Sequence, residues 1–285
     1  MTGMKYFSLS KITLLALLTA PLLACSEGSI HSLALSPDDS AQGAEPPVVD
    51  PGPETDLEGE NPPTTENKFR LDQEVNKFKL RYGVTSASTK LVDNKGQGNE
   101  DLYGARNVRV VLHGVMYRGG ANNKYLNPPR NNVNPLPTVG LNNLCREDFS
   151  TAVYLYSENF SSAPKSVKCK NTSHQDQSLQ YKQYAAAGEK EKILALVYDR
   201  IKGKLDGPVY AHCWNGWHSS GLISAIALKQ FCGWSNSKVD AYWVKNTDGN
   251  SSGFTTLRNR IRDFKPLAKY TITAEEKALV CPETY

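Results

Sequence analysis

The amino-acid sequence predicts an α/β fold, with helices on the faces of a central sheet. Segments with the period of a strand alternate with segments with the period of a helix between residues 107 and 264. These segments lie in the 218-residue stretch Lys68–Tyr285, which is long enough to bury one sizeable core. The composition excludes collagen, a coiled coil and full-length disorder, and the single short apolar run excludes a polytopic membrane protein.

Short runs rich in valine or tyrosine predict the strands. We expect strands at residues 107–112, 114–117, 152–156, 166–170 and 209–212. The intervening stretch Gly119–Pro137 is crowded with Gly, Asn and Pro, which predicts a long loop.

Apolar residues at helical spacing predict the helices. We expect helices at residues 187–201, 221–231, 236–245 and 254–264. The segment 221–231 is apolar nearly all round, so it is expected to be buried in the core. Thr273 followed by Glu276 forms a capping box that opens a final short helix.

The N-terminal residues are typical of an export signal. Two lysines precede the apolar run Ile12–Ala24, which at about 13 residues is shorter than the roughly 20 residues that span a bilayer. The run ends Leu-Leu-Ala-Cys, which resembles the bacterial lipobox, with Cys25 as the lipidated first residue after a 1–24 signal peptide. Because Ser26 is not Asp, the resemblance implies the outer membrane. The alternative is an ordinary cleaved signal with a chance cysteine.

The segment 25–67 differs in composition from the rest of the chain. Residues 26–67 hold ten acidic residues, seven prolines and no Lys or Arg, so this segment is expected to be a disordered tether. An acidic recognition segment is the alternative. The domain at 68–285 carries 31 Lys and Arg against 19 Asp and Glu, a net charge of +12. This charge favours an anionic partner, although no nucleic-acid-binding motif is present.

One segment carries a pattern suited to nucleophilic chemistry. A buried strand ends in His212-Cys213, a short loop containing Gly216 follows, and the apolar helix starts near Ser220-Gly221. The N–H groups of such a loop and of the first helical turn converge on one spot and bind anions. The same field favours the thiolate of a cysteine at its edge, and the thiolate is the nucleophilic form.

This segment resembles the active-site loop of the cysteine-dependent tyrosine and dual-specificity phosphatases, His-Cys-x-x-Gly-x-x-Arg-Ser/Thr-Gly. The resemblance implies a tyrosine-phosphatase-like central sheet with helices on both faces. It also implies that Cys213 forms a phosphocysteine intermediate, that the Ser220 hydroxyl helps the sulfur leave and that His212 orients the loop. The residues implied to bind phosphate are Trp214, Asn215, Gly216, Trp217, His218, Ser219 and Gly221. The alternative for Cys213 is a buried inert thiol.

The sequence departs from that family at Ser219, where the family has an arginine. A serine cannot make the bidentate contact of a guanidinium with a phosphoryl group. Either the charge comes from elsewhere, or the site binds its ligand without turnover. Arg118, in a Tyr-Arg-Gly-Gly stretch that resembles an early motif of the family, is one candidate for supplying the charge. Other candidates are Arg258, Arg260 and Arg262, and His218 could donate a hydrogen bond or, if protonated, a charge.

The remaining site residues have open roles. Asp176 precedes Cys213 by 37 residues and is a candidate for the family's general acid, with a solvated loop aspartate as the alternative. Trp214 is expected to pack on the domain, and Trp217 either packs or stacks on a ligand.

Other catalytic classes fit the sequence less well. A serine-hydrolase elbow lacks its first glycine, and the histidine that it or a papain-like protease needs downstream is absent after His218. A zinc site lacks suitable spacing, and we expect no metal or cofactor.

The chain has six cysteines, and an exported domain lies where disulfides can form. Setting Cys25 aside leaves an odd number, and the motif makes Cys213 the free thiol. The other four allow three connectivities, of which we expect Cys145–Cys169 and Cys232–Cys281 from proximity in the expected topology. The leading hypothesis is thus an envelope phosphatase-like hydrolase acting on a phosphorylated substrate, anchored to the membrane through Cys25. The rival is a pseudophosphatase that binds a phosphorylated or sulfated ligand.

Overall fold

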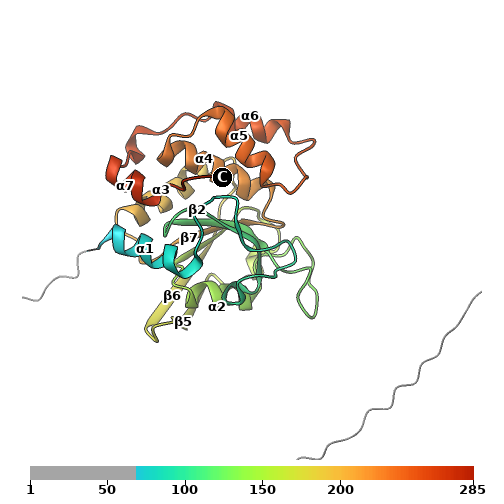
Figure 1. Ribbon diagram of the computed structural model, residues 1–285. Coiled ribbons are helices and arrows are strands. Elements are labelled where there is room, and N and C mark those ends of the chain that lie inside the picture. Colours follow the sequence, from blue (N-terminus) through green and yellow to red (C-terminus); the bar gives the residue numbers. More distant parts are fainter. Residues whose placement is uncertain (1–68) are drawn as a thin grey trace, which may run out of the picture. The chain divides into compact units, whose positions relative to one another are not determined.

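The computed structural model describes residues 69–285, and within them the chain forms a mixed seven-stranded sheet surrounded by helices (Figure 1). This confirms the predicted fold class, an α/β sheet with helices on both faces. The expected signal peptide 1–24, the lipidation site Cys25 and the tether 25–67 lie outside the described residues. No helix between residues 69 and 285 is long and apolar enough to cross a membrane.

The strand order places one parallel strand at the centre of the sheet. The order is β1-β2-β3-β7-β4-β6-β5, and β3, β7, β4 and β6 run parallel to one another. β1, β2 and β5 are antiparallel to their neighbours. The bounds are β1 Lys90–Val92, β2 Ala105–Leu112, β3 Met116–Ala121, β4 Thr151–Tyr154, β5 Ser166–Lys170, β6 Asp176–Gln183 and β7 Val209–Cys213.

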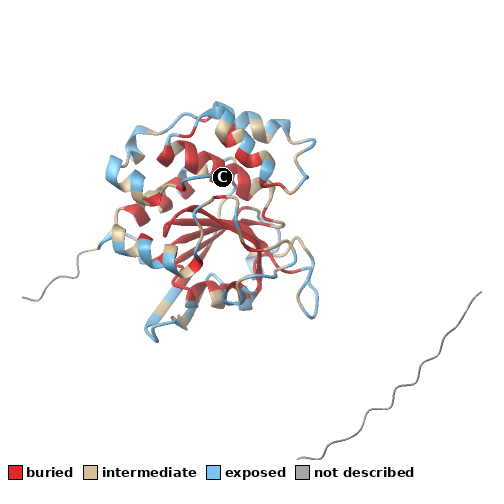
Figure 2. Cartoon of the chain, in the orientation of Figure 1, coloured by how far each residue is buried: buried red, intermediate tan, exposed pale blue. Residues whose placement is uncertain are grey.

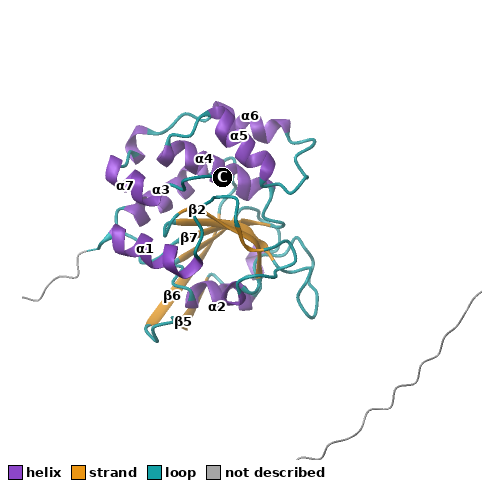
Figure 3. Ribbon diagram, in the orientation of Figure 1, coloured by secondary structure: helices purple, strands orange, loops and turns teal. Residues whose placement is uncertain are grey.

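Helices cover both faces of this sheet (Figure 3). Their bounds are α1 Leu71–Tyr82, α2 Thr138–Arg146, α3 Lys190–Ile201, α4 His218–Cys232, α5 Asn236–Lys245, α6 Thr255–Asp263 and α7 Ala274–Val280. The helices α3, α4, α5 and α6 share one apolar cluster, and α2 packs in the other. The final helix begins with the predicted capping box at Thr273.

The central strand contributes to both clusters because successive side chains of a strand point to opposite faces. Val209 and Ala211 pack in the cluster under α4, whereas Tyr210 packs on the α2 side. Figure 2 shows that α4 and the central strands are the most continuously buried elements, as the apolar composition of the helix predicts. The strand–loop–helix unit that carries Cys213 is therefore anchored in the core at both ends.

Several elements differ from the sequence prediction. The expected loop from Gly119 begins later, because β3 continues to Ala121. The sequence patterns did not predict α1, α2, β1 or β6. Of these, α1 buries only Val75, Phe78 and Tyr82, and six of the eight residues of β6 remain at least partly exposed, as does every residue of its neighbour β5. Apolar periodicity is a weak signal in elements that bury so little.

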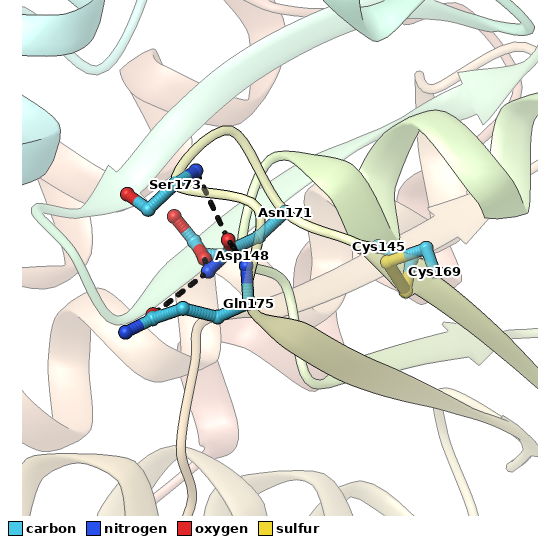
Figure 4. The surroundings of a disulfide bond; sticks show 6 residues. All are labelled: Cys145, Asp148, Cys169, Asn171, Ser173 and Gln175. Carbon is cyan, nitrogen blue, oxygen red and sulfur yellow. Dashed lines mark hydrogen bonds between the residues drawn. A yellow bond between two sulfur atoms is a disulfide. The ribbon is translucent and has the colours of Figure 1, made fainter. Parts of the chain in front are cut away.

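Two disulfides join elements that are distant in the sequence, and both were predicted. Cys145 of α2 bonds Cys169 of β5, and Cys232 at the end of α4 bonds Cys281. The turn after β5 is held next to the first disulfide, where the side chain of Asn171 donates to Asp148 Oδ1 at 2.8 Å and accepts from the backbone of Ser173 and Gln175 (Figure 4).

We expect loss of the Cys232–Cys281 disulfide to lower the free energy of unfolding by about 4 kcal/mol, because it closes a loop of 49 residues. The measurement is urea unfolding of a Cys232→Ser, Cys281→Ser double variant against the unaltered protein. A change below about 1 kcal/mol would contradict the expectation.

Candidate active site

Cys213 lies at the carboxyl end of β7, the central strand of the sheet. Its neighbours β3 and β4 run parallel to it, and ligands of α/β sheets bind outside the carboxyl ends of such strands. Cys213 is a free cysteine and its side chain is 3% exposed. The thiol therefore has the position and the oxidation state that the sequence motif predicted.

The loop 214–217 lies directly against β3, and this contact requires glycine. A Cβ atom on Gly120 would lie 2.5 Å from the carbonyl oxygen of Trp214 and 2.7 Å from the backbone nitrogen of Gly216. Gly216 has a φ of +79°, a left-handed conformation that side chains disfavour. Glycines on both partners thus let two stretches of backbone approach closely.

Donors on β2 and β3 bind the carbonyl oxygens of this loop. The Trp214 oxygen accepts from the backbone N–H of Ala121 at 3.1 Å and, more weakly, from Arg106. The Asn215 oxygen accepts from Asn107 Nδ2 at 3.1 Å. The oxygens of Gly216 and Trp217 accept from the guanidinium of Arg118 at 2.6 and 2.9 Å.

Because C=O and N–H of a trans peptide point in opposite directions, the N–H groups that follow the bound oxygens of Trp214, Gly216 and Trp217 face away from β2 and β3. The N–H of Gly216 is the exception, because Asn215 forms an antiparallel bridge with Gly120 of β3. The first turn of α4 adds further N–H groups, because its N-cap residue, Trp217, provides no side-chain cap. The arrangement is that of an anion-binding cradle at a helix N-terminus.

Ser220 faces the thiol from the first turn of α4. Its Oγ lies 3.4 Å from Cys213 Sγ, and both side chains are buried. The structure thus brings the predicted nucleophile and the predicted assisting hydroxyl into contact. The next residue, Gly221, packs against Trp243 and Arg118, since a Cβ atom there would lie 3.0 Å from the indole ring.

His212 is held neutral inside the sheet. The carbonyl oxygen of Cys213 can only accept, so Nδ1 of the imidazole, 3.2 Å away, carries the proton. Nε2 of the neutral ring therefore accepts from the Tyr181 hydroxyl at 2.8 Å, and that hydroxyl accepts in turn from the backbone N–H of Leu136. Burial lowers the pKa of His212 to about 3. His212 is therefore uncharged at neutral pH, and its two hydrogen bonds fix the ring at the end of β7.

We expect the buried neutral His212 to make the fold sensitive to acid. Its pKa is lower in the folded protein than the usual 6.5, so its contribution to stability is complete above pH 6.5 and is lost as the pH falls toward 3. Between pH 7 and pH 5 the loss is about 2 kcal/mol. Urea unfolding at both pH values should show a smaller decrease in a His212→Gln variant, and an equal decrease would contradict this assignment.

The two tryptophans of the loop have different surroundings. Trp214 stacks on Tyr156 with ring centroids 4.5 Å apart, and its Nε1 donates to the Tyr154 hydroxyl at 2.9 Å, so it packs on the domain as expected. Trp217 donates from Nε1 to Asp248 at 3.1 Å and to Asn94 at 3.3 Å. The protein thus binds the N–H edge of Trp217, and stacking of a ligand on its face stays a prediction.

Ser219 and His218 point to partners within the protein. Ser219 Oγ donates to the Tyr156 hydroxyl at 3.0 Å. His218 stacks on Phe254 and its Nε2 lies 2.7 Å from the carbonyl oxygen of Asn250. Burial lowers the pKa of His218, which disfavours the charged form considered for it. Neither side chain therefore takes the place of the arginine guanidinium that the resembling family has at the position of Ser219.

The candidate arginines also do not lie where they could contact a bound phosphate directly. Arg118 is fully buried and binds the carbonyl side of the loop, which corrects the expectation that it contacts phosphate directly. Arg258 pairs with Asp240 at 2.5 Å. Arg260 and Arg262 are exposed on α6, and Arg262 bonds Asn259 on the same helix.

Asp176 is remote from the thiol. It begins β6 and pairs with Lys170 at 2.8 Å, with its side chain largely exposed. The register of β6 with β4 and β7 places Gln183, the last residue of β6, at the end of the sheet that carries Cys213. Seven residues of strand span about 23 Å, so Asp176 lies at the opposite end. The structure does not support the expected role of Asp176 as general acid.

The sequence analysis missed three polar residues that hold the loop: Arg106, Asn107 and Asp248. The first two belong to β2, in which every residue is buried. Charged and amide side chains within a fully buried strand are unusual, and this pattern was a usable signal. Asp248 follows α5, and only the folded chain brings it to Trp217.

Among residues 69–285, no group of three or more His, Cys, Asp or Glu side chains could hold a metal ion. Comparison with known proteins adds little: no family model and no curated protein matches the chain. A solved structure, that of TpbA from P. aeruginosa, matches with 15% identity over 55% of this chain and 86% of that one, at a TM-score of 0.35.

Proposed function

We propose that the protein hydrolyses a phosphoester through a phosphocysteine intermediate at Cys213. The observation that carries this proposal is the contact of Cys213 Sγ with Ser220 Oγ at 3.4 Å, beside a loop whose carbonyl oxygens are all bound on its outer side. A nucleophile, an assisting hydroxyl and a set of inward N–H groups then surround one position.

The reaction proceeds in two displacements. The Cys213 thiolate attacks phosphorus, a P–S bond forms, and the ester oxygen leaves with its electron pair and takes a proton from water. Water then attacks the phosphocysteine and gives up a proton to the hydroxide that the first step left, the P–S bond breaks, and the sulfur leaves as a thiolate that accepts a hydrogen bond from Ser220. Because Asp176 is remote, the acidity of the leaving alcohol matters more, and we expect aryl phosphates to react faster than alkyl phosphates.

The test is phosphate release by the purified chain across a panel of aryl and alkyl phosphoesters, with Cys213→Ser beside it. Release that disappears in the variant supports the proposal. Release that survives in the variant contradicts it.

A second candidate function is binding without turnover. It is favoured by Ser219, whose hydroxyl bonds Tyr156 where the resembling family has its arginine. Phosphate binding by the unaltered chain together with no release from any ester of the panel would favour this alternative. In that case Ser219→Arg is expected to create turnover.

We also propose that the chain is exported and anchored through a lipid on Cys25. The two disulfides support this location, because such bonds persist in oxidising compartments. The test is membrane fractionation of a Cys25→Ala variant. Loss of the protein from the membrane fraction is expected, and unchanged membrane association would contradict the anchor.

A further inference from the structure

Two buried arginines elsewhere in the fold each form an ion pair with a carboxylate. Arg109 on β2 is 1% exposed, and its guanidinium lies 3.1 Å from a carboxylate oxygen of Asp248. Arg200 on α3 is also 1% exposed and pairs with Glu74 at 2.7 Å. In both cases a carboxylate offsets the cost of removing the charge from water.

Arg106 and Arg118, which lie behind the Cys213 loop, have no such partner. They are 4% and 0% exposed. Within the described range 69–285, neither guanidinium forms an ion pair with an Asp or Glu side chain. Two buried positive charges thus lie against the loop, and no carboxylate of the described residues pairs with them.

Only neutral groups bind these two guanidiniums. Arg118 donates to the Gly216 and Trp217 carbonyl oxygens and to the Tyr242 hydroxyl at 3.3 Å, and its Nε has no hydrogen-bond partner. The partners of Arg106 are the side chains of Asn132, at 2.7 Å, and Asn215, and the carbonyl oxygens of Asn94 and Trp214, both at 3.4 Å.

Both guanidiniums lie on the outer side of the loop, and the thiol lies at its other face. The field of a buried charge is only weakly screened by salt, so it extends through the loop to the cradle. Hydrogen bonds to the carbonyl oxygens also polarise the peptides and strengthen their N–H groups as donors. Burial lowers the pKa of Arg106, and the nearby Cys213 sulfur opposes this shift.

We propose that Arg106 and Arg118 supply the positive charge of the anion site from behind the loop, in place of the guanidinium absent at Ser219. The bound oxyanion and the Cys213 thiolate then provide the negative charge that no Asp or Glu side chain of the described residues provides. Both are positioning residues, since they act through the loop and do not touch the ligand. This inference rests on the proposed function and identifies how its site attracts an anion.

The sharpest test adds a carboxylate next to Arg106 without removing the arginine. Asn132 accepts from Arg106 at 2.7 Å, is partly exposed, and donates from Nδ2 to Asn215 Oδ1 of the loop at 3.0 Å. Asn132→Asp therefore neutralises the guanidinium and also removes this one donor, and Asn132→Ala, which removes the donor without adding a charge, separates the two effects. Asn131→Asp is the matched control, because it adds the same charge to the exposed neighbouring position. Isothermal titration of the full chain with inorganic phosphate reports the affinity, and thermal unfolding checks the fold.

We expect Asn132→Asp to weaken phosphate binding by about tenfold or more and Asn131→Asp to leave it nearly unchanged. Arg118→Gln should weaken binding similarly, whereas Arg200→Gln, which disrupts a compensated pair, should lower stability without this loss. Unchanged affinity in both Asn132→Asp and Arg118→Gln would overturn this inference alone. Absence of phosphate binding by the unaltered chain would contradict the proposed site as well.

Discussion

Replacing Gly120 by alanine is expected to remove nearly all activity while the domain stays folded. The new Cβ atom would lie 2.5 Å from the Trp214 oxygen and within 2.7 Å of two further backbone atoms of the loop. Backbone on both sides cannot move aside as a flexible side chain can, so the loop must shift away from β3. A displacement of about 1 Å at a catalytic group costs about 10²-fold in rate.

The control for this variant is Gly188→Ala. Gly188 precedes α3, and a Cβ atom there meets nothing within 4 Å. Rates of phosphate release and thermal unfolding of both variants separate a local displacement from unfolding. Full activity in Gly120→Ala would show that the contact between β3 and the loop is not needed to hold the cradle.

Replacing Ser220 by alanine is expected to slow the second displacement more than the first. The Ser220 hydroxyl lies 3.4 Å from the sulfur and stabilises it as it leaves phosphorus as a thiolate. General acid–base and hydrogen-bonding groups of this kind contribute about 10²-fold or more. We therefore expect a burst of alcohol release followed by slow turnover, measured by stopped-flow with an aryl phosphate.

Ser224 provides the matched control for Ser220. It lies one turn further along α4, is equally buried, and donates to the Ser220 carbonyl oxygen at 2.7 Å, away from the thiol. Ser224→Ala should keep both phases of the reaction. A burst in neither variant, with both turning over at the rate of the unaltered chain, would remove Ser220 from the mechanism.

Local patterns predicted the part of the fold that carries Cys213. The segment from Val209 to Cys232 combines a short apolar run, a glycine-containing loop and an apolar helix, and each signal lies within a few residues. The fold class followed from the alternation of such segments. Elements with few buried residues, such as α1 and β6, gave no comparable signal because their apolar positions are sparse.

Predictions that placed charged side chains relative to Cys213 were less reliable. The distance of Asp176 from Cys213 along the chain suggested a shared site, but sequence spacing does not say at which end of a strand a residue lies. The sequence motif makes Arg118 a candidate for the site, yet only the fold shows that it binds the carbonyl oxygens on the outer side of the loop. The absence of a carboxylate beside Arg106 is also a property of the tertiary structure, since no local pattern reports which charges remain uncompensated.

The proposed mechanism requires that Cys213 becomes phosphorylated during turnover. Rapid acid quench of the chain during turnover of an aryl phosphate, followed by mass spectrometry of the intact protein and its peptides, detects this species. We predict one phosphoryl group per chain, located on the peptide that contains Cys213, enriched in Ser220→Ala and absent in Cys213→Ser. Phosphate release without a phosphorylated cysteine, or a phosphoryl group that persists in Cys213→Ser, would contradict the proposed mechanism.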